Sequence, residues 1–372
     1  MYIVVKNLRQ ARVARCVLLT LLLLALSWVA VQSEDVRDLG PAGRVQSQLK
    51  GIDVVQKTGA NDSSTEQKNL TAAMLYAQTG QVELLKELLV ANPDVAARQY
   101  KGVGITALHY AAQHNQVEAA TLLIRHGADV SVVDNSSRHT PLHTAAGCDA
   151  LDVVKVLIEA GADINCLAEG PLKTDTLSPT KYASPLDVAA EMGAEHVVEF
   201  LLTKGAKLDV NPQVSSCSAL HRAMFGNYDR QGLGNPKRST DPTTNAARGN
   251  RKVIEMLLAH KADLNGKDSL GNTPFHIGVY RHALDSVDYL LKNYADRIDV
   301  NAPGQFKMTP LQLVVSRRRQ GVEQSVKGVI TLLREHGASV TLVGGPSVPQ
   351  KTAFEVAQRE KWGNDILDLL RP

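Results

Sequence analysis

Aromatic side chains are scarce in this chain, in which Phe, Trp and Tyr make up 4% of the 372 residues. Proteins that bind single-stranded nucleic acid stack the bases on aromatic side chains, so this scarcity argues against such a platform. The chain also lacks a large excess of charge of one sign, because 41 Lys and Arg stand against 38 Asp and Glu. We therefore expect no nucleic-acid partner.

Cysteine is also rare, with four residues in the whole chain. Cys16 lies in an apolar N-terminal stretch, which leaves Cys148, Cys166 and Cys217 for the rest. This small, odd count does not support a disulfide framework. Cys148 has no readable activating base or oxyanion arrangement beside it, so the sequence does not predict a catalytic thiol.

The first 33 residues differ from the remainder in charge and hydropathy. They hold four of the 41 Lys and Arg and none of the 38 acids, so the remainder has 37 basic residues against 38 acidic ones. The basic stretch precedes the apolar run CVLLTLLLLALSWVAV, residues 16–31. This order is typical of a secretory signal peptide over residues 1–33. A signal anchor is the alternative, although a spanning helix needs about 20 residues.

Either leader would send the rest of the chain across a membrane, because the basic flank stays on the cytoplasmic side. A cleaved leader predicts a secreted, periplasmic or secretory-pathway lumen protein. An uncleaved leader predicts a single-pass anchor with the remainder on the non-cytoplasmic side. Membrane contact is expected only in the second case.

The remainder repeats itself. Residues 106–129 read TALHYAAQHNQVEAATLLIRHGAD, and residues 140–163 read TPLHTAAGCDALDVVKVLIEAGAD. Several units begin 34 to 36 residues apart, which is typical of a solenoid. One helix pair cannot bury its own apolar face, so the next copy must cover it. The units open at Thr71, Thr106, Thr140, Ser184, Ser218, Thr273, Thr309 and Thr352.

The openings TPLHTAA, SPLDVAA, SALHRAM and TPFHIGV resemble the T-P-L-H-x-A motif of the ankyrin repeat, and LLIRHGAD and VLIEAGAD resemble its second half. The resemblance covers residues 69–372. It implies an all-α ankyrin-repeat solenoid of about eight helix-turn-helix units joined by β-hairpin-like loops. Residues 34–68 are polar and are predicted to be a flexible lead-in. Insertions interrupt the array near residues 168–181, 227–248 and 317–323.

Helix ends follow from residue chemistry. A Thr followed by Pro caps a helix well, because the hydroxyl accepts from free backbone amides and the ring presets φ. A glycine ends the second helix of four units in the left-handed conformation that it tolerates. Lys261 and Tyr294 occupy this position in two other units, so we expect those two ends to be less regular. The four glycines are Gly127, Gly161, Gly205 and Gly337.

A row of histidines recurs at the motif's fourth position and raises the question of a metal site. Successive units stack roughly 10 Å apart, too far for two of them to share an ion at about 2 Å. The resemblance instead implies that each imidazole forms a hydrogen bond with the neighbouring turn. We expect no metal, no cofactor and no enzyme. These histidines are His109, His143, His221 and His276.

The resemblance implies a partner surface on the concave face, made of hairpin tips and first helices. Ordinary solvated residues are the alternative interpretation for each position. A basic edge beside two insertions, with Arg281 and His282 between them, would meet an acidic protein surface, or anionic headgroups if the chain is anchored. The predicted contacts are Tyr100, Lys101, Gln113, His114, Glu191, Met192, Tyr280, Arg281 and Phe306. The predicted basic edge comprises Arg230, Lys237, Arg238, Arg248, Arg251, Lys252, Arg317, Arg318 and Arg319.

The sequence therefore predicts a non-catalytic protein-interaction scaffold that is exported and monomeric by itself, with an unidentified protein partner. Two alternatives stay open. One is a membrane-anchored assembly factor. The other is a secreted inhibitor or effector that blocks a target enzyme through the loop at residues 227–248.

Overall fold

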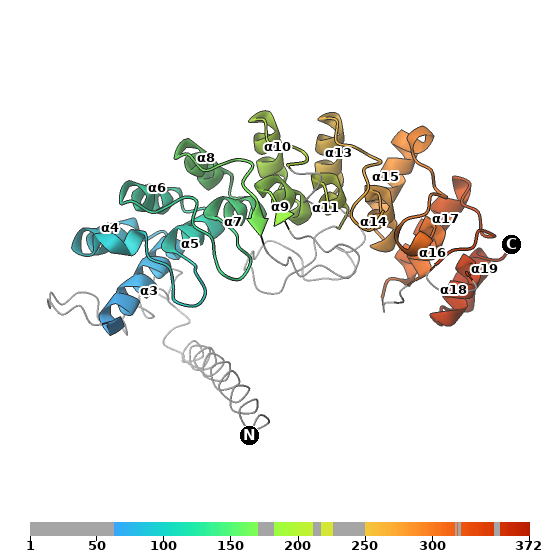
Figure 1. Cartoon of the computed structure of the whole chain (residues 1–372), viewed down its shortest axis with the longest axis horizontal. Helices are drawn as coiled ribbons and strands as arrows, with labels where there is room; N and C mark the ends of the chain where they lie inside the picture. Colours follow the sequence, from blue (N-terminus) through green and yellow to red (C-terminus); the bar gives the residue numbers. More distant parts are fainter. Residues whose placement is uncertain are drawn as a thin grey trace, which may run out of the picture. The chain divides into compact units, whose positions relative to one another are not determined.

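A computed structural model describes residues 63–169, 182–210, 217–225, 250–316, 318, 321–345 and 350–372. Within these ranges the chain forms eight successive helix pairs (Figure 1). The leader and most of the predicted lead-in lie outside the described residues. Among the helices of the described ranges, none is long and apolar enough to cross a membrane.

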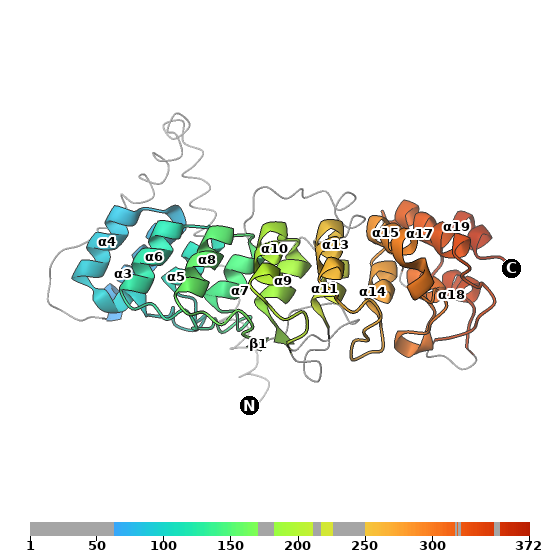
Figure 2. The same cartoon turned by 90° about the horizontal axis from the view of Figure 1, so that it is seen from above.

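The first helices pack against one another in chain order, and so do the second helices, so two rows run along the array (Figures 1 and 2). The first row is α3 (Ser63–Thr79), α5 (Ala107–Gln113), α7 (Pro141–Gly147), α9 (Pro185–Met192), α11 (Ala219–Phe225), α14 (Pro274–Tyr280), α16 (Pro310–Val315) and α18 (Ala353–Arg359). The second row is α4 (Val82–Ala91), α6 (Val117–Arg125), α8 (Leu151–Glu159), α10 (Glu195–Thr203), α13 (Arg251–Ala259), α15 (Leu284–Tyr294), α17 (Glu323–Glu335) and α19 (Asn364–Leu369).

Short elements occupy the connections between units. The strands β1 (Ala168–Glu169) and β2 (Tyr182–Ala183) pair antiparallel, with Ala168 opposite Ala183, at the base of the first insertion. The 3-10 turns are η2 (Pro93–Ala96), η3 (Ala295–Arg297) and η4 (Gln305–Lys307). The all-α array predicted from the sequence is confirmed, with hairpins between its units.

The first helices begin at the predicted Thr or Ser in most units. In α7 the Thr140 hydroxyl accepts from the His143 amide, and the His143 ring accepts from the Thr140 amide, so both free donors are satisfied. The prediction is wrong for Thr71, which lies inside α3 and donates its hydroxyl to the Gln67 carbonyl. The helix α3 begins at Ser63, ahead of the predicted boundary at residue 69.

The four glycines that follow second helices adopt left-handed φ values of 87°, 93°, 82° and 87°, as predicted. Lys261 adopts the same conformation, with φ 67°, and its amide donates to the Leu258 carbonyl. The prediction of an irregular helix end is therefore wrong at Lys261. The hydrogen bond of the turn holds Lys261 in the left-handed conformation, although this residue has a Cβ. At Tyr294 it is confirmed, because α15 runs on into the 3-10 turn η3.

The core lies between the two rows of helices. The alanine pairs of α5 and α7 are fully buried, which lets these helices approach closely. Second helices contribute a buried apolar stripe, such as Val153, Val154 and Leu157 of α8. Each unit thus covers its neighbour. We call the face made of first helices and hairpins the inner face.

Candidate functional site

The recurring histidines join each unit to the next. The Nδ1 atom of His143 accepts from the Thr140 amide at 3.3 Å, so Nε2 carries the proton and donates to the Ala183 carbonyl at 3.0 Å. His109, His221 and His276 make the same pair of contacts, to the carbonyls of His139, Asn272 and Ala302. This confirms the predicted hydrogen bond to the neighbouring turn.

Burial decides the charge state of these rings. It lowers the pKa of His143 to about 3, against weaker opposing effects, and it lowers the pKa of the other three. All four are therefore neutral at pH 7. The described part of the chain also contains no group of three His, Cys, Asp or Glu side chains placed to hold a metal ion.

A cleft of about 470 Å³ opens on the inner face across α5, α7 and α9. The hairpin that ends at His139 forms another wall, closed by the bond from the Asp134 amide to the His139 carbonyl at 2.9 Å. The lining of the cleft combines apolar side chains, polar side chains and the two acidic residues Asp134 and Glu191. The lining residues are Gln78, Ile105, His109, Tyr110, Gln113, His114, Asp134, Ser136, Ser137, His139, His143, Thr144, Gly147, Cys148, Val188, Glu191 and Met192.

The cleft exists because one unit carries small side chains between two units that carry larger ones. On α7 and at its end, the lining residues are Thr144, Gly147 and Cys148. A Cβ at Gly147 would lie 3.1 Å from the Val188 Cγ1 atom, so even a methyl group would crowd this floor. The flanking walls come from Tyr110, Gln113 and His114 of the preceding unit and from Val188, Glu191 and Met192 of the following unit.

Among the described residues, no Lys or Arg lines the cleft. Burial lowers the pKa of His114, so this ring is neutral at pH 7. Burial alone would raise the pKa of Asp134, but hydrogen bonds from Ser136 and Ser137 outweigh it and hold that pKa at about 2. The carboxylate is thereby saturated with donors from its own hairpin. Glu191, the other acidic residue of the lining, is paired with Arg222. With both carboxylates bonded within the chain, the described lining offers a ligand mainly an apolar surface and neutral polar groups.

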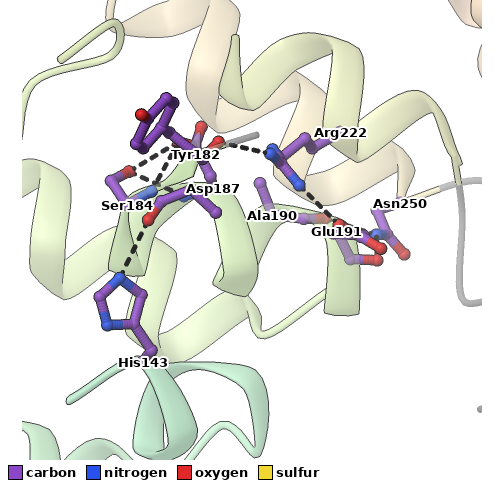
Figure 3. Close-up of polar contacts among 9 residues, drawn as sticks. His143, Tyr182, Ser184, Asp187, Ala190, Glu191, Arg222 and Asn250 are labelled. Atoms are coloured by element: carbon purple, nitrogen blue, oxygen red, sulfur yellow. Dashed lines mark hydrogen bonds and ion pairs between the residues drawn. The ribbon is translucent and has the colours of Figure 1, made fainter. Parts of the chain in front are cut away.

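Glu191 of the cleft lining also belongs to a buried ionic cluster (Figure 3). The fully buried Arg222 donates from Nη1 to Glu191 Oε2 at 2.9 Å and from Nη2 to the Tyr182 carbonyl at 2.9 Å. Burial raises the pKa of Asp187, and the positive charge of Arg222 opposes that shift. Asn250 donates to the Ala190 and Glu191 carbonyls, which holds the end of α9 in place.

The structure brings some predicted contacts together and separates others. Gln113, His114 and Met192 line the cleft. Glu191 also lines the cleft, where it is largely buried in the pair with Arg222. Tyr280 is buried and lies outside the cleft lining, so for both residues partner contact stays a prediction.

Three further contact predictions lie at hairpin tips: Tyr100, Lys101 and Phe306 are exposed. Arg281 lies over the Phe225 ring, 4.8 Å from its centre. Sequence reasoning missed Tyr110, Thr144 and Val188, which line the cleft. Their signal is their shared place directly after the fourth position of the repeat motif.

The described members of the predicted basic edge are engaged within the chain. Arg251 pairs with Glu255 and lies over the Tyr289 ring, and Lys252 pairs with Glu195. Arg318 donates to the Lys361 carbonyl. The other members lie outside the described residues: Arg230, Lys237, Arg238, Arg248, Arg317 and Arg319.

His282 was expected on that edge between the two insertions. It is instead buried, and its ring donates from Nε2 to the Val314 carbonyl at 3.0 Å. The prediction that His282 lies on the basic edge is therefore wrong. The physical reason is the left-handed turn at His282, φ 57°, which directs this residue toward the next unit.

Comparisons with known proteins agree with this geometry. Ankyrin-repeat families match residues 47–134 and 73–168 (ankyrin repeats, 3 copies), 182–213 (ankyrin repeat) and 246–291 (ankyrin repeats, many copies). The ankyrin repeat domain of human ASB11 superposes with a TM-score of 0.51 at 24% identity, covering 72% of this chain and 99% of that domain. This likeness shows the fold.

Curated relatives match part of this chain. Potassium channel AKT2/3 of Arabidopsis thaliana is 27% identical over 169 residues, which is 43% of this chain and 20% of the channel. L-asparaginase of Dirofilaria immitis is 26% identical over 215 residues, 55% of this chain and 28% of that enzyme. The chain thus spans less than a third of either relative. Because the family matches together span more than half of its residues, this chain belongs to the ankyrin-repeat family.

Proposed function

We propose that this chain is a non-catalytic scaffold whose inner-face cleft receives an uncharged segment of a protein partner. Ankyrin repeats support protein–protein interaction as the mode of action. The observation that carries the proposal is the cleft of about 470 Å³ at the small unit α7, a volume typical of binding sites. Packed helices on both sides hold this surface rigid, so little ordering entropy is lost on binding.

The chemistry around the cleft favours binding over catalysis. Cys166 Sγ lies 3.8 Å from His143 Nδ1, which is the geometry of a thiol beside a base. Burial raises the pKa of Cys166 to about 11 and lowers that of His143 to about 3. At pH 7 the thiol therefore keeps its proton, and the ring remains a hydrogen-bonded link between units.

Filling the cleft tests the proposal. Cys148→Trp places an indole where a small side chain lines the floor, and Cys148→Ser keeps the volume as a matched control. We expect the C148W variant to lose tenfold or more of its affinity for proteins that the wild type captures from its native host, because the partner segment and the indole need the same space. Capture followed by quantitative mass spectrometry measures this ratio.

The C148S variant should retain the same proteins at wild-type levels. Circular dichroism and thermal unfolding of the C148W variant show whether the array is still folded. Equal capture by all three forms would mean that the cleft is not the binding site.

We further propose that residues 1–33 export the array, on the strength of the basic and apolar order of the leader. We expect the N-terminal peptide of the protein purified from its native host to begin near Glu34, as measured by mass spectrometry. A peptide that begins at Met1, on a chain that sediments with membranes, would instead favour the anchored alternative. Residues 227–248, on which the inhibitor alternative depends, lie outside the described residues.

A further inference from the structure

Three large apolar side chains are exposed at two adjacent hairpins, away from the cleft. Phe306 is 58% exposed, Val343 54% and Leu342 40%. Single exposed apolar residues are common on soluble proteins, whereas a group of them marks an interaction site. We call Phe306, Leu342 and Val343, together with Lys307, the apolar tip.

Backbone contact holds the two hairpins of the apolar tip together. A Cβ at Gly344 would overlap the Lys307 carbonyl oxygen, so the two hairpins meet there without an intervening side chain. Gln312 donates from Nε2 to the Leu342 carbonyl at 3.1 Å and to the Lys351 carbonyl at 2.6 Å. The exposed side chains flank this contact within one or two residues, on a fixed frame.

The conformation that presents Phe306 is a costly one. Phe306 and Lys307 are both left-handed, with φ 54° and 58°, although neither is glycine. Such a conformation is strained for a residue with a Cβ. Burial of the Phe306 ring does not offset this strain, because the ring is exposed in the described structure. Strain of this kind clusters at binding sites.

The two hairpins of the apolar tip carry basic residues and no acidic ones. Residues 302–308 and 340–351 contain Lys307 and Lys351 and no Asp or Glu. Lys267 is exposed on the hairpin of the preceding unit. A complementary ligand therefore combines apolar side chains with neighbouring carboxylates. Two lysines are fewer than the four to eight of a typical lipid-binding cluster, which favours a protein ligand over a membrane surface.

We propose that the apolar tip is a second docking surface, which binds a segment of a protein partner that carries apolar residues flanked by Asp or Glu. This inference rests on the scaffold function proposed above and adds to it a surface outside the cleft and the chemistry of the ligand. Phe306 and Val343 would supply the buried contact, and Lys307 would meet the carboxylates of the ligand.

Peptide selection tests this proposal without a known partner. A random peptide library displayed on phage is selected on the purified full-length chain. Enriched peptides are then measured against a Phe306→Ser, Val343→Ser double variant. We expect peptides with apolar residues beside Asp or Glu, and a loss of tenfold or more in affinity for the double variant. Val90→Ser is the matched control, because Val90 is 68% exposed on α4 and lies outside the apolar tip.

A positioning variant gives a second readout. Gly344→Ala removes no apolar side chain but forces the two hairpins apart, so we expect weaker peptide binding with unchanged helix content. Affinity should also fall with added salt, because the carboxylates of the peptide meet Lys307.

Three results would overturn the inference. One is equal peptide affinity for the wild type and the double variant. Another is a set of peptides lost in C148W alone, which would support the cleft and remove the apolar tip. The third is binding of phosphatidylserine vesicles that the double variant abolishes while no peptide is enriched, which would identify a lipid surface.

Discussion

Replacing Arg222 with methionine is expected to lower the free energy of unfolding by about 3–5 kcal/mol. The guanidinium group is fully buried and is the cation that Glu191 and Asp187 face. Without it, both carboxyl groups lose their compensating charge, and the Tyr182 carbonyl loses a donor. Because each repeat is stabilised by its neighbours, the loss is felt beyond this unit. Urea unfolding followed by circular dichroism measures the change.

The Arg222 prediction has two controls. Arg251→Met removes an exposed arginine that also pairs with a carboxylate, and it should leave the free energy of unfolding nearly unchanged. Adding Glu191→Gln to Arg222→Met should recover part of the loss, since one uncompensated carboxylate is then removed. An Arg222→Met variant as stable as the wild type would show that the cluster does not hold α9 against α11.

The fold could be predicted from the sequence because its signals are periodic. The Thr or Ser caps, the paired alanines and the glycines after second helices recur in phase, and each acts through local backbone chemistry. The same locality explains the misses. Thr71 opens no helix, because α3 continues past it toward the N-terminus. Lys261 keeps a left-handed turn because the hydrogen bonds of that turn outweigh the preference for glycine.

The candidate site was less predictable, because it depends on contacts between residues far apart in the chain. Arg222 and Glu191 are 31 residues apart, and the burial of the pair follows only from stacking. The cleft depends on a comparison across three units, in which small residues at Thr144 and Gly147 lie between larger ones. To make that comparison from the sequence, one must know that equivalent motif positions of successive units lie side by side on the inner face. The exposure of Phe306, by contrast, followed from its hairpin position alone.

The array is expected to lose stability as the pH falls from 7 to 5, and the histidine links are the cause. The folded pKa of His143 is about 3, against about 6.5 for an unfolded histidine. Between these values the unfolded chain binds a proton that the folded chain does not, so stability falls as the pH falls. For His143 alone the loss between pH 7 and 5 is about 2 kcal/mol. His109, His221 and His276 shift in the same direction and add to it.

The chain itself supplies the matched variant. In the seventh unit Gln312 replaces the histidine; its Oε1 accepts from the Thr309 amide at 2.7 Å, and its Nε2 donates to the Leu342 carbonyl. His143→Gln should therefore keep both hydrogen bonds and remove one titrating group. We expect this variant to be less stable than the wild type at pH 7, where the ring packs against His139, and to lose about 2 kcal/mol less between pH 7 and 5. Urea unfolding at both pH values measures the change in stability of each protein.

Asp134 and Asp187 titrate in both proteins, so their contributions cancel in the difference. If stability changed equally with pH in both proteins, His143 would not be a buried neutral ring, and its assigned role as a link between units would be wrong.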